Sequence, residues 1–282
     1  MMAEPLPRRL VRKPWGRRDL PGWTGAEAQS EPVGEVWFPD PAGDEADLLV
    51  KYLFTSEKLS IQVHPDDRAA RASGHRRGKD EAWLVLRADP GAAIGLGLRE
   101  AVSRGALRAA ALDGSIERLI DWRPVRAGDL FYSPAGTVHA IGAGLTVLEI
   151  QQNLDLTYRL YDYGRPRELH LDAGIAAADP SPWRAAGSTR AIAPGRDALA
   201  SGAAFVVERW RDAAGIIGGD GLAPVWVIPL EAGASLDGRP LEPGSVWTMR
   251  GQAELAVPPS AELLLAYAGS EIRFAPEPRR SP

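Results

Sequence analysis

Pro134-Ala135-Gly136-Thr137-Val138-His139 carries the strongest structural signal in this 282-residue chain. Proline and glycine in this order indicate a tight turn, and the apolar residue before the histidine indicates that a strand begins there. The stretch follows Gly128-Asp129 and precedes Glu149-Ile150-Gln151-Gln152-Asn153. Upstream, Gln62-Val63-His64 brings a second histidine to the end of a β-segment. The two histidines are therefore candidate partners in one site.

The composition indicates an all-β protein. Thirty glycines and 24 prolines stand between short apolar runs, and 45% of the residues are hydrophobic, a pattern typical of many turns between short strands. The length permits one large core or two modest ones. There is no cysteine, so disulfides and thiolate metal sites are excluded, and any metal must rest on histidine, carboxylate and amide groups.

Charge and hydropathy exclude several classes of partner. The net charge of −4 gives no reason to expect nucleic acid. No segment approaches the roughly 18 consecutive apolar residues of a membrane helix. Residues 1–18 are basic but lack a following apolar region, so we expect no secretory signal. We expect a soluble, cytoplasmic globular protein.

The local patterns predict where strands and helices lie. Residues 1–30 show little periodicity and are expected to wrap the body as an irregular arm. A short polar helical insert is expected between residues 65 and 77. The main helical stretch is expected at 99–121, where apolar residues recur at helical spacing. Strands, some of them separated by turns, are expected over 33–38, 48–54, 59–64, 81–86, 125–144 and 145–163.

Two domains are expected, because beyond about residue 173 the amino-acid composition becomes rich in alanine, glycine and proline. The segment LEPGSVW at 241–247 echoes VRAGDLF at 125–131, as in a weak internal repeat whose second copy has lost its histidine. A chance origin stays open, since glycine turns before strands arise easily. The expected boundaries are 1–172 for a catalytic domain with a helical insert at about 99–121, and 173–282 for a degenerate domain without metal.

Gln62, His64, Glu81 and His139 form a candidate metal site. Strand alternation places Gln62 and His64 on one face, about 7 Å apart. Two imidazoles, one carboxylate and one amide oxygen suit a divalent ion, with zinc expected. The formal charge near +1 suits a Lewis acid better than a structural role. A lone histidine in a strand is more often a satisfied polar residue, but two that both end β-segments favour ligands.

The other two histidines lie in different contexts. His75 lies in a solvated Gly-His-Arg-Arg loop and is not expected to be a ligand. His170 is either a substrate contact or a surface residue.

Five sequence blocks resemble a known family. Gly128-x5-Pro134-x-Gly136-x2-His139 resembles the second motif of the cupin superfamily. More specifically, the chain resembles type I mannose-6-phosphate isomerase in its compact bacterial form, with order and spacing that hold over roughly residues 35–172. The matching blocks are SIQVHPDD at 60–67, GKDE at 78–81, PAGTVHA at 134–140, EIQQN at 149–153 and DLTYRLYD at 155–162.

The resemblance implies a bicupin, that is, two jelly-roll β-barrels with a short helical insert. It implies one zinc ion per chain, with Gln62, His64, Glu81 and His139 as ligands. It implies that Arg159 is the catalytic arginine and that Lys79 and Asp155 line the same pocket. The family interconverts mannose 6-phosphate and fructose 6-phosphate through a cis-enediol. The C-terminal third matches only loosely, and the family's phosphate-binding residues have no clear equivalents.

The residues leave several roles open. Arg159 keeps its charge and can grip two oxygens, but it could instead form a salt bridge with Asp155. Lys79, Asp155 and His170 remain candidates for the proton carrier. Candidates for the phosphate ligand are Arg165, Arg167 and Lys79, although an Arg-x-Arg segment more commonly forms a solvated loop.

Three alternatives to the phosphorylated substrate and the isomerase reaction remain. The first is an isomerase of a free aldose such as mannose. The second is a non-catalytic sugar-binding or regulatory cupin. The third is an iron-dependent cupin dioxygenase, which the neutral Gln62 disfavours. The expected partner is a small sugar phosphate, and the expected assembly is a monomer or weak homodimer.

Overall fold

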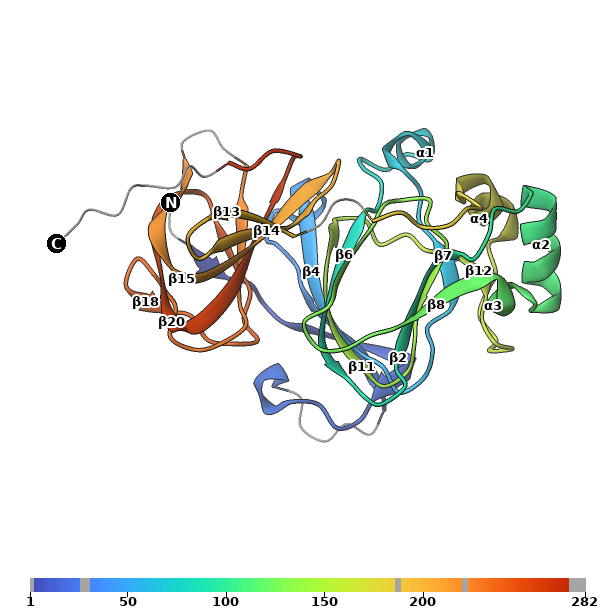
Figure 1. Ribbon diagram of the computed structural model, residues 1–282, viewed down its shortest axis with the longest axis horizontal. Helices are drawn as coiled ribbons and strands as arrows, with labels where there is room; N and C mark the ends of the chain where they lie inside the picture. Colours follow the sequence, from blue (N-terminus) through green and yellow to red (C-terminus); the bar gives the residue numbers. More distant parts are fainter. Residues whose placement is uncertain (1–2, 26–30, 186–188, 220–222, 274–282) are drawn as a thin grey trace.

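The computed structural model describes residues 3–25, 31–185, 189–219 and 223–273 and consists mainly of antiparallel sheets, which confirms the all-β expectation (Figure 1). No helix in these ranges is long and apolar enough to cross a membrane. The first sheet runs, in spatial order, β2 (Arg9–Arg17), β3 (Val33–Phe38), β4 (Leu48–Phe54), β11 (Leu145–Gln152), β6 (Glu81–Ala88) and β9 (Leu130–Ser133).

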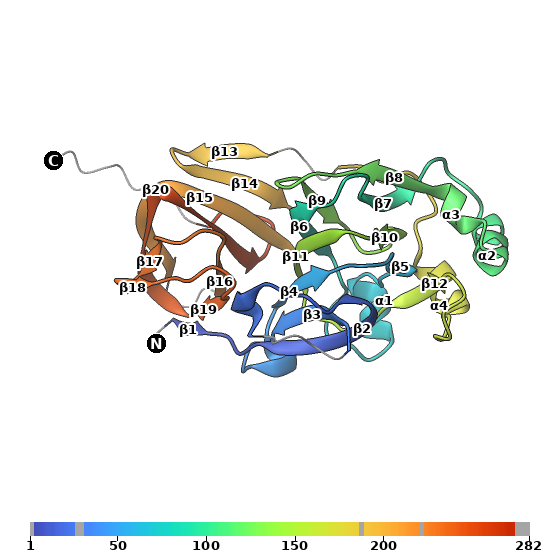
Figure 2. The same cartoon turned by 90° about the horizontal axis from the view of Figure 1, so that it is seen from below.

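A five-stranded sheet faces this one and carries the helices on its other side. Its order is β12 (Tyr158–Tyr161), β5 (Ile61–Val63), β10 (His139–Ile141), β7 (Ala93–Leu98) and β8 (Ile120–Pro124). The helices α2 (Arg104–Asp113), α3 (Ile116–Leu119) and α4 (Leu171–Ala177) lie at the end of the molecule opposite the C-terminal strands (Figure 1, Figure 2). The short α1 (Asp67–Ala72) follows β5.

The C-terminal residues form a third sheet of nine strands. Its main path is β1 (Glu4–Pro5), β19 (Trp247–Met249), β16 (Val225–Pro229), β20 (Gly251–Ala268), β15 (Phe205–Gly219), β14 (Arg196–Ser201) and β13 (Arg190–Ala193). Off this path, β17 (Ser235–Leu236) pairs with β18 (Arg239–Pro240) and with β20.

Strand alternation sorts the side chains of the five-stranded sheet between two environments. Ile61 and Val63 belong to the apolar cluster that also contains Leu107 of α2 and Ile175 of α4. Gln62, between them, projects to the other face, toward the six-stranded sheet. The helices thus cover the apolar face of this sheet, and the space between the two sheets receives the polar residues together with a separate apolar cluster.

The six-stranded sheet is buried on both faces. Val85 and Val147 pack toward Ile94 of the five-stranded sheet. On the opposite face, Leu148 and Ile150 belong to a cluster that includes residues of the C-terminal sheet. The C-terminal members of that cluster include Phe205, Val207, Trp226, Ile228, Leu264 and Ala266. This apolar layer, called the seam below, joins the two halves of the molecule.

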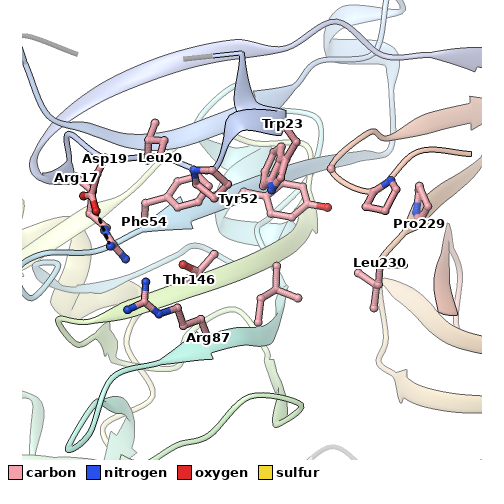
Figure 3. Close-up of a pocket in the computed structure, with 14 residues that line it drawn as sticks. Arg17, Asp19, Leu20, Trp23, Tyr52, Phe54, Arg87, Thr146, Pro229 and Leu230 are labelled. Atoms are coloured by element: carbon pink, nitrogen blue, oxygen red, sulfur yellow. Dashed lines mark hydrogen bonds and ion pairs between the residues drawn. The ribbon is translucent and has the colours of Figure 1, made fainter. Parts of the chain in front are cut away.

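A cavity of about 420 Å³ lies at one end of the seam, apart from the candidate metal ligands (Figure 3). Trp23 packs against Tyr52 with ring centroids 4.6 Å apart and the ring planes tilted by 59°, and Pro229 and Leu230 close the C-terminal side. Arg17 at the rim is ion-paired with Asp19. The cavity is a gap in an otherwise packed apolar layer.

The expected irregular arm over residues 1–30 is wrong for its described parts. β1 pairs with β19 in the C-terminal sheet, and β2 pairs with β3 in the six-stranded sheet. The single Pro and several charged residues of β2 hide its strand character, but its position at a sheet edge tolerates both. Residues 26–30 lie outside the described ranges.

Other local expectations match the structure. The expected strands at 33–38 and 48–54 coincide with β3 and β4. The helical stretch at 99–121 is divided into α2 and α3 by Gly114, which ends α2 with φ of 79°. The sequence did not predict α4, which begins at Leu171 and runs across the expected domain boundary at residues 172 and 173. The division into two barrel domains remains a prediction.

Candidate metal centre

Three neighbouring strands place candidate residues in one row across the five-stranded sheet. Gln62 of β5 lies opposite His139 of β10 on one side and opposite Arg159 of β12 on the other. His64 follows β5 directly, and Glu81 begins β6 in the facing sheet. Residues far apart in sequence therefore converge because the strands that carry them pair or face one another.

His64, Glu81 and His139 form a compact buried group that can hold a metal ion. One ligand atom from each lies within 4.8 Å of the other two. His64 Nε2 is 3.3 Å from Glu81 Oε1, and His139 Nε2 is 3.5 Å from Glu81 Oε2. Each side chain is at most 2% exposed. The three residues thus meet at one point shielded from water.

Hydrogen bonds orient both imidazoles for metal binding. Nδ1–H of His64 donates to the Leu156 carbonyl at 2.9 Å, and Nδ1–H of His139 donates to the Thr137 carbonyl at 2.9 Å. Such bonds fix the tautomer and leave Nε2 as a lone-pair donor. Burial lowers the pKa of His64 and lowers that of His139 to about 4. Both rings are therefore neutral at physiological pH, as ligands must be.

Glu81 is a buried carboxylate whose contacts are ion pairs rather than hydrogen bonds. Neither of its buried oxygens accepts a hydrogen bond from any described residue, although Lys79 Nζ lies 2.9 Å from Oε1 as an ion pair. Burial alone would raise the pKa of Glu81, but His64 and Lys79 outweigh it and hold the pKa well below its usual range. A buried carboxylate with free lone pairs beside two imidazole nitrogens fits a divalent cation.

Gln62 contacts the same group through its side-chain amide. Its Nε2 lies 3.2 Å from His139 Nε2, and its Oε1 accepts a hydrogen bond from Ser60 Oγ at 3.0 Å. Rotating the side-chain amide by 180° would direct Oε1 toward the His64–Glu81–His139 group. The NH₂ group could then donate a hydrogen bond to the Ser60 hydroxyl, which can accept as well as donate. Gln62 is therefore positioned to act as a fourth ligand.

A cavity of about 60 Å³ opens beside His139 and Gln62. Charged side chains line it, and the cations outnumber the anions. The cations are Lys13, Lys51, Lys79, Arg159 and Arg167, and the anions are Glu35, Glu149 and Asp155. The cavity thus favours an anionic guest next to the metal-binding group.

Lys79 lies inside this arrangement and remains a cation in the metal-free protein. It is 4% exposed, and its Nζ is 3.3 Å from His64 Nε2. Burial would lower its pKa, but the charges of Glu81 and Glu149 outweigh burial and raise it.

Arg159 lines the cavity without a carboxylate partner among the described residues. Its Nη1 donates to the Glu168 carbonyl at 3.3 Å, and the alternative salt bridge to Asp155 is not formed. Burial, reinforced by the nearby Arg167, lowers the pKa of Arg159. Asp155 is exposed and lines the same cavity, which places it at the rim.

Glu149 is the cavity residue whose role sequence reasoning missed. It accepts a hydrogen bond from Trp83 Nε1 at 3.1 Å and lies 3.4 Å from Lys51 Nζ. Burial and the charge of Glu81 raise its pKa to about 7, against the opposing effect of Lys51. The sequence did carry one signal for Glu149, because it is a charged residue between Leu148 and Ile150 in a predicted strand.

The remaining candidates lie around the site rather than in it. Nδ1 of His170 accepts a hydrogen bond from the Arg159 backbone at 3.3 Å, and His75 is exposed. Arg165 and Arg167 both pair with the buried Asp162, at 2.7 and 2.6 Å. Only Arg167 of this pair lines the cavity.

No family model matches the chain. It is 36% identical over 214 residues to the mannose-6-phosphate isomerase of Streptococcus mutans, which covers 62% of this chain and 67% of that protein. It is 40% identical over 156 residues to mannose-6-phosphate isomerase ManA of Bacillus subtilis, covering 51% of this chain and 49% of that one. The match thus spans about half of the B. subtilis relative.

Solved structures extend the similarity over nearly the whole fold. The crystal structure of mannose 6-phosphate isomerase from B. subtilis has a TM-score of 0.78 and 26% identity, and covers 93% of this chain and 98% of that one. Mutants of phosphomannose isomerase from Salmonella typhimurium, about 15% identical with a TM-score of 0.71 in one case, share the fold. The architecture is therefore cupin-like.

Proposed function

Since the chain belongs to the mannose-6-phosphate isomerase family of enzymes, we propose that it interconverts mannose 6-phosphate and fructose 6-phosphate through a cis-enediol. The observation that carries this proposal is the buried His64–Glu81–His139 group, which adjoins a cavity lined mainly by cations. We also propose the bicupin division, with a catalytic domain at 1–172 and a metal-free domain at 173–282.

The metal is proposed to be one zinc ion per chain, held by Gln62, His64, Glu81 and His139. Two imidazole nitrogens, a carboxylate and an amide oxygen match the ligand preferences of zinc. When bound, the ion supplies Lewis-acid stabilisation of negative charge on the sugar oxygens. The buried oxygens of Glu81 accept no hydrogen bond from a described residue and have Lys79 as an ion-pair partner, so they keep lone pairs for such an ion.

Arg159 and Lys79 are proposed to stabilise the charge that develops on the substrate. Moving a proton between C1 and C2 of the sugar places negative charge on the carbonyl oxygen. Arg159 has no carboxylate to neutralise it and lines the cavity, so its guanidinium is available to that oxygen. Lys79 adds a second fixed positive charge from the cavity wall.

Glu149 is proposed as the group that carries the proton. A carboxyl group whose pKa is about 7 can both accept and donate a proton near neutral pH. Two of the other candidates fit less well, since His170 already accepts a hydrogen bond from the Arg159 backbone and Asp155 is exposed. Lys79 has a raised pKa in the metal-free protein and becomes a second candidate only if metal on Glu81 lowers it.

The cation excess in the cavity supports a phosphorylated substrate over a free sugar. The enclosed space of about 60 Å³ is well below the roughly 300–1,000 Å³ of typical ligand pockets. Side chains at the cavity mouth would therefore move when a hexose phosphate enters, whereas Arg167 is held by two hydrogen bonds to Asp162. The phosphate is proposed to lie against Arg167, which leaves Arg159 to the sugar oxygen.

A coupled assay with metal-quantified protein tests the proposal. We expect chelator-sensitive formation of fructose 6-phosphate from mannose 6-phosphate, restored by added zinc. Turnover of free mannose with none of mannose 6-phosphate would instead support the free-aldose isomerase. Binding of sugar phosphate without turnover, at full metal occupancy, would support a sugar-binding protein.

A further inference from the structure

Tyr132 connects the seam with the candidate metal centre. Its ring packs on Phe205 of β15, with centroids 5.2 Å apart, and is 4% exposed. Gly202 lies close to the hydroxyl-bearing end of the ring. A Cβ added at Gly202 would lie only 1.9 Å from Tyr132 Cζ. The C-terminal half of the chain therefore determines where this ring can lie.

The hydroxyl of Tyr132 fixes a carboxylate next to the metal-binding residues. It donates to Asp80 Oδ2 at 2.5 Å, and Asp80 stands between Lys79 and Glu81 in the chain. The other oxygen, Oδ1, accepts a hydrogen bond from the Ala135 amide at 2.9 Å. Asp80 thus links the Glu81 strand to the turn that leads to His139.

This link begins where the backbone ladder stops. The pairing of β6 with β9 ends at Glu81 and Ser133. Beyond that pair, the Asp80 side chain continues the connection to Ala135, in the turn that precedes β10. His139 is also held by the pairing of β10 with β5, and Gly136 by the His64 carbonyl, but the Asp80 carboxylate and its phenol partner make the direct link between the start of β6 and this turn.

We propose that Tyr132 is a positioning residue through which the C-terminal half sets the geometry of the metal centre. The ring receives the contacts of Gly202 and Phe205, and the hydroxyl transmits their position to Asp80. The proposal rests on the metal site proposed above. The C-terminal half contains none of the proposed metal ligands. The proposal nevertheless gives that half an indirect effect on zinc affinity.

Two tyrosine variants test the proposal. Tyr132→Phe removes one hydroxyl that donates to a carboxylate. Tyr267→Phe is the matched control, because its buried hydroxyl donates to Glu208 inside the C-terminal half. Zinc affinity would be measured by competition with a chromophoric chelator, and amide exchange of residues 135–139 would be measured in metal-free protein.

Loss of groups that orient metal ligands weakens binding by about 10- to 100-fold. Since Tyr132 acts through Asp80, we expect the lower end, about a 10-fold weaker zinc affinity, with faster exchange at Ala135. Tyr267→Phe should lower the melting temperature but leave zinc affinity within about 2-fold. Unchanged affinity and exchange in Tyr132→Phe, or equal losses in both variants, would overturn the proposal.

Two further provisions keep the test decisive. If Tyr132→Phe does not fold, the replacement variant is Asp80→Asn, which removes the negative charge that accepts the phenol hydrogen bond. Asp80 is half-buried. The same weaker zinc affinity and faster exchange at Ala135 are expected. If wild-type protein binds no zinc, the proposed function fails, while exchange at Ala135 still decides whether Tyr132 positions the turn.

Discussion

Replacing Arg159 with alanine should separate catalysis from stability. The structure gives this guanidinium one hydrogen bond, to the Glu168 carbonyl at 3.3 Å, and no carboxylate partner among the described residues. A bond of this kind contributes about 0.5–1.5 kcal/mol to folding. For a chain of this length that corresponds to a fall in melting temperature of no more than about 5 °C.

The effect on turnover should be much larger. Removing one group that stabilises developing charge costs about 2.7–4 kcal/mol, which is about a 100- to 1,000-fold fall in kcat. The assay would compare kcat, bound zinc and melting temperature for Arg159→Ala and wild type. Because the proposed ligands are untouched, zinc content should stay at one per chain.

Arg104→Ala is the matched control. Arg104 also donates to backbone carbonyls, those of Ile175 at 3.1 Å and Ala178 at 3.0 Å, but it lies outside the cavity. It should show a similar or larger stability loss with normal kcat. If Arg159→Ala kept kcat within about 3-fold of wild type, or if both variants lost activity in step with stability, the catalytic assignment of Arg159 would be refuted.

Three other perturbations have defined outcomes. Burial and the charge of Glu81 raise the pKa of Glu149 to about 7 in the metal-free protein, and zinc on Glu81 would cancel part of the second effect. The kcat/KM of the zinc enzyme should therefore rise with pH through a limb at or below that value, and Glu149→Gln should abolish this limb. Chelation should lower the free energy of unfolding by about 2.7 kcal/mol relative to protein at a free zinc concentration 100 times Kd, measured by thermal melts across zinc concentrations. Trp226 is fully buried in the seam and its indole N–H has no partner among the described residues. Urea unfolding should show a loss of about 3–5 kcal/mol for Trp226→Ala and a smaller loss for Trp226→Phe, which leaves a smaller cavity and removes the unpartnered N–H.

The ligand residues could be identified from sequence because their signals are local. Alternation along a strand is enough to put Gln62 on the face opposite Ile61 and Val63, and a proline–glycine turn is enough to mark the approach to His139. Their actual meeting depends on the pairing of β5 with β10, across 77 residues of chain. Local pattern thus names the residues, and tertiary pairing alone makes them a site.

β7 shows why other elements were missed. Its sequence AIGLGL contains two glycines, which disfavour strands locally. The structure needs both: a Cβ at Gly95 would lie 2.5 Å from Ile120 Cγ2, and one at Gly97 would lie 2.2 Å from the Trp183 backbone nitrogen. These close approaches involve residues distant in sequence, so no local pattern reports them.

Glu149 was missed for the same physical reason. Its importance comes from the partners that strand pairing assembles around it: Lys51 from one neighbouring strand, Trp83 from the other, and the charge of Glu81. A glutamate in a strand has no perturbed pKa until such burial exists. Sequence can therefore point to a carboxyl group but cannot give its working pKa.

The role of Lys79, as a permanent cation or as a proton-transferring group, depends on the charge of the neighbouring Glu81. Without metal, its ammonium compensates the buried Glu81 carboxylate at 2.9 Å, and its pKa is raised. A divalent ion on Glu81 would cancel that attraction, leaving burial and repulsion from the ion to lower the pKa. The choice between a fixed cation and an acid or base is therefore set by metal occupancy.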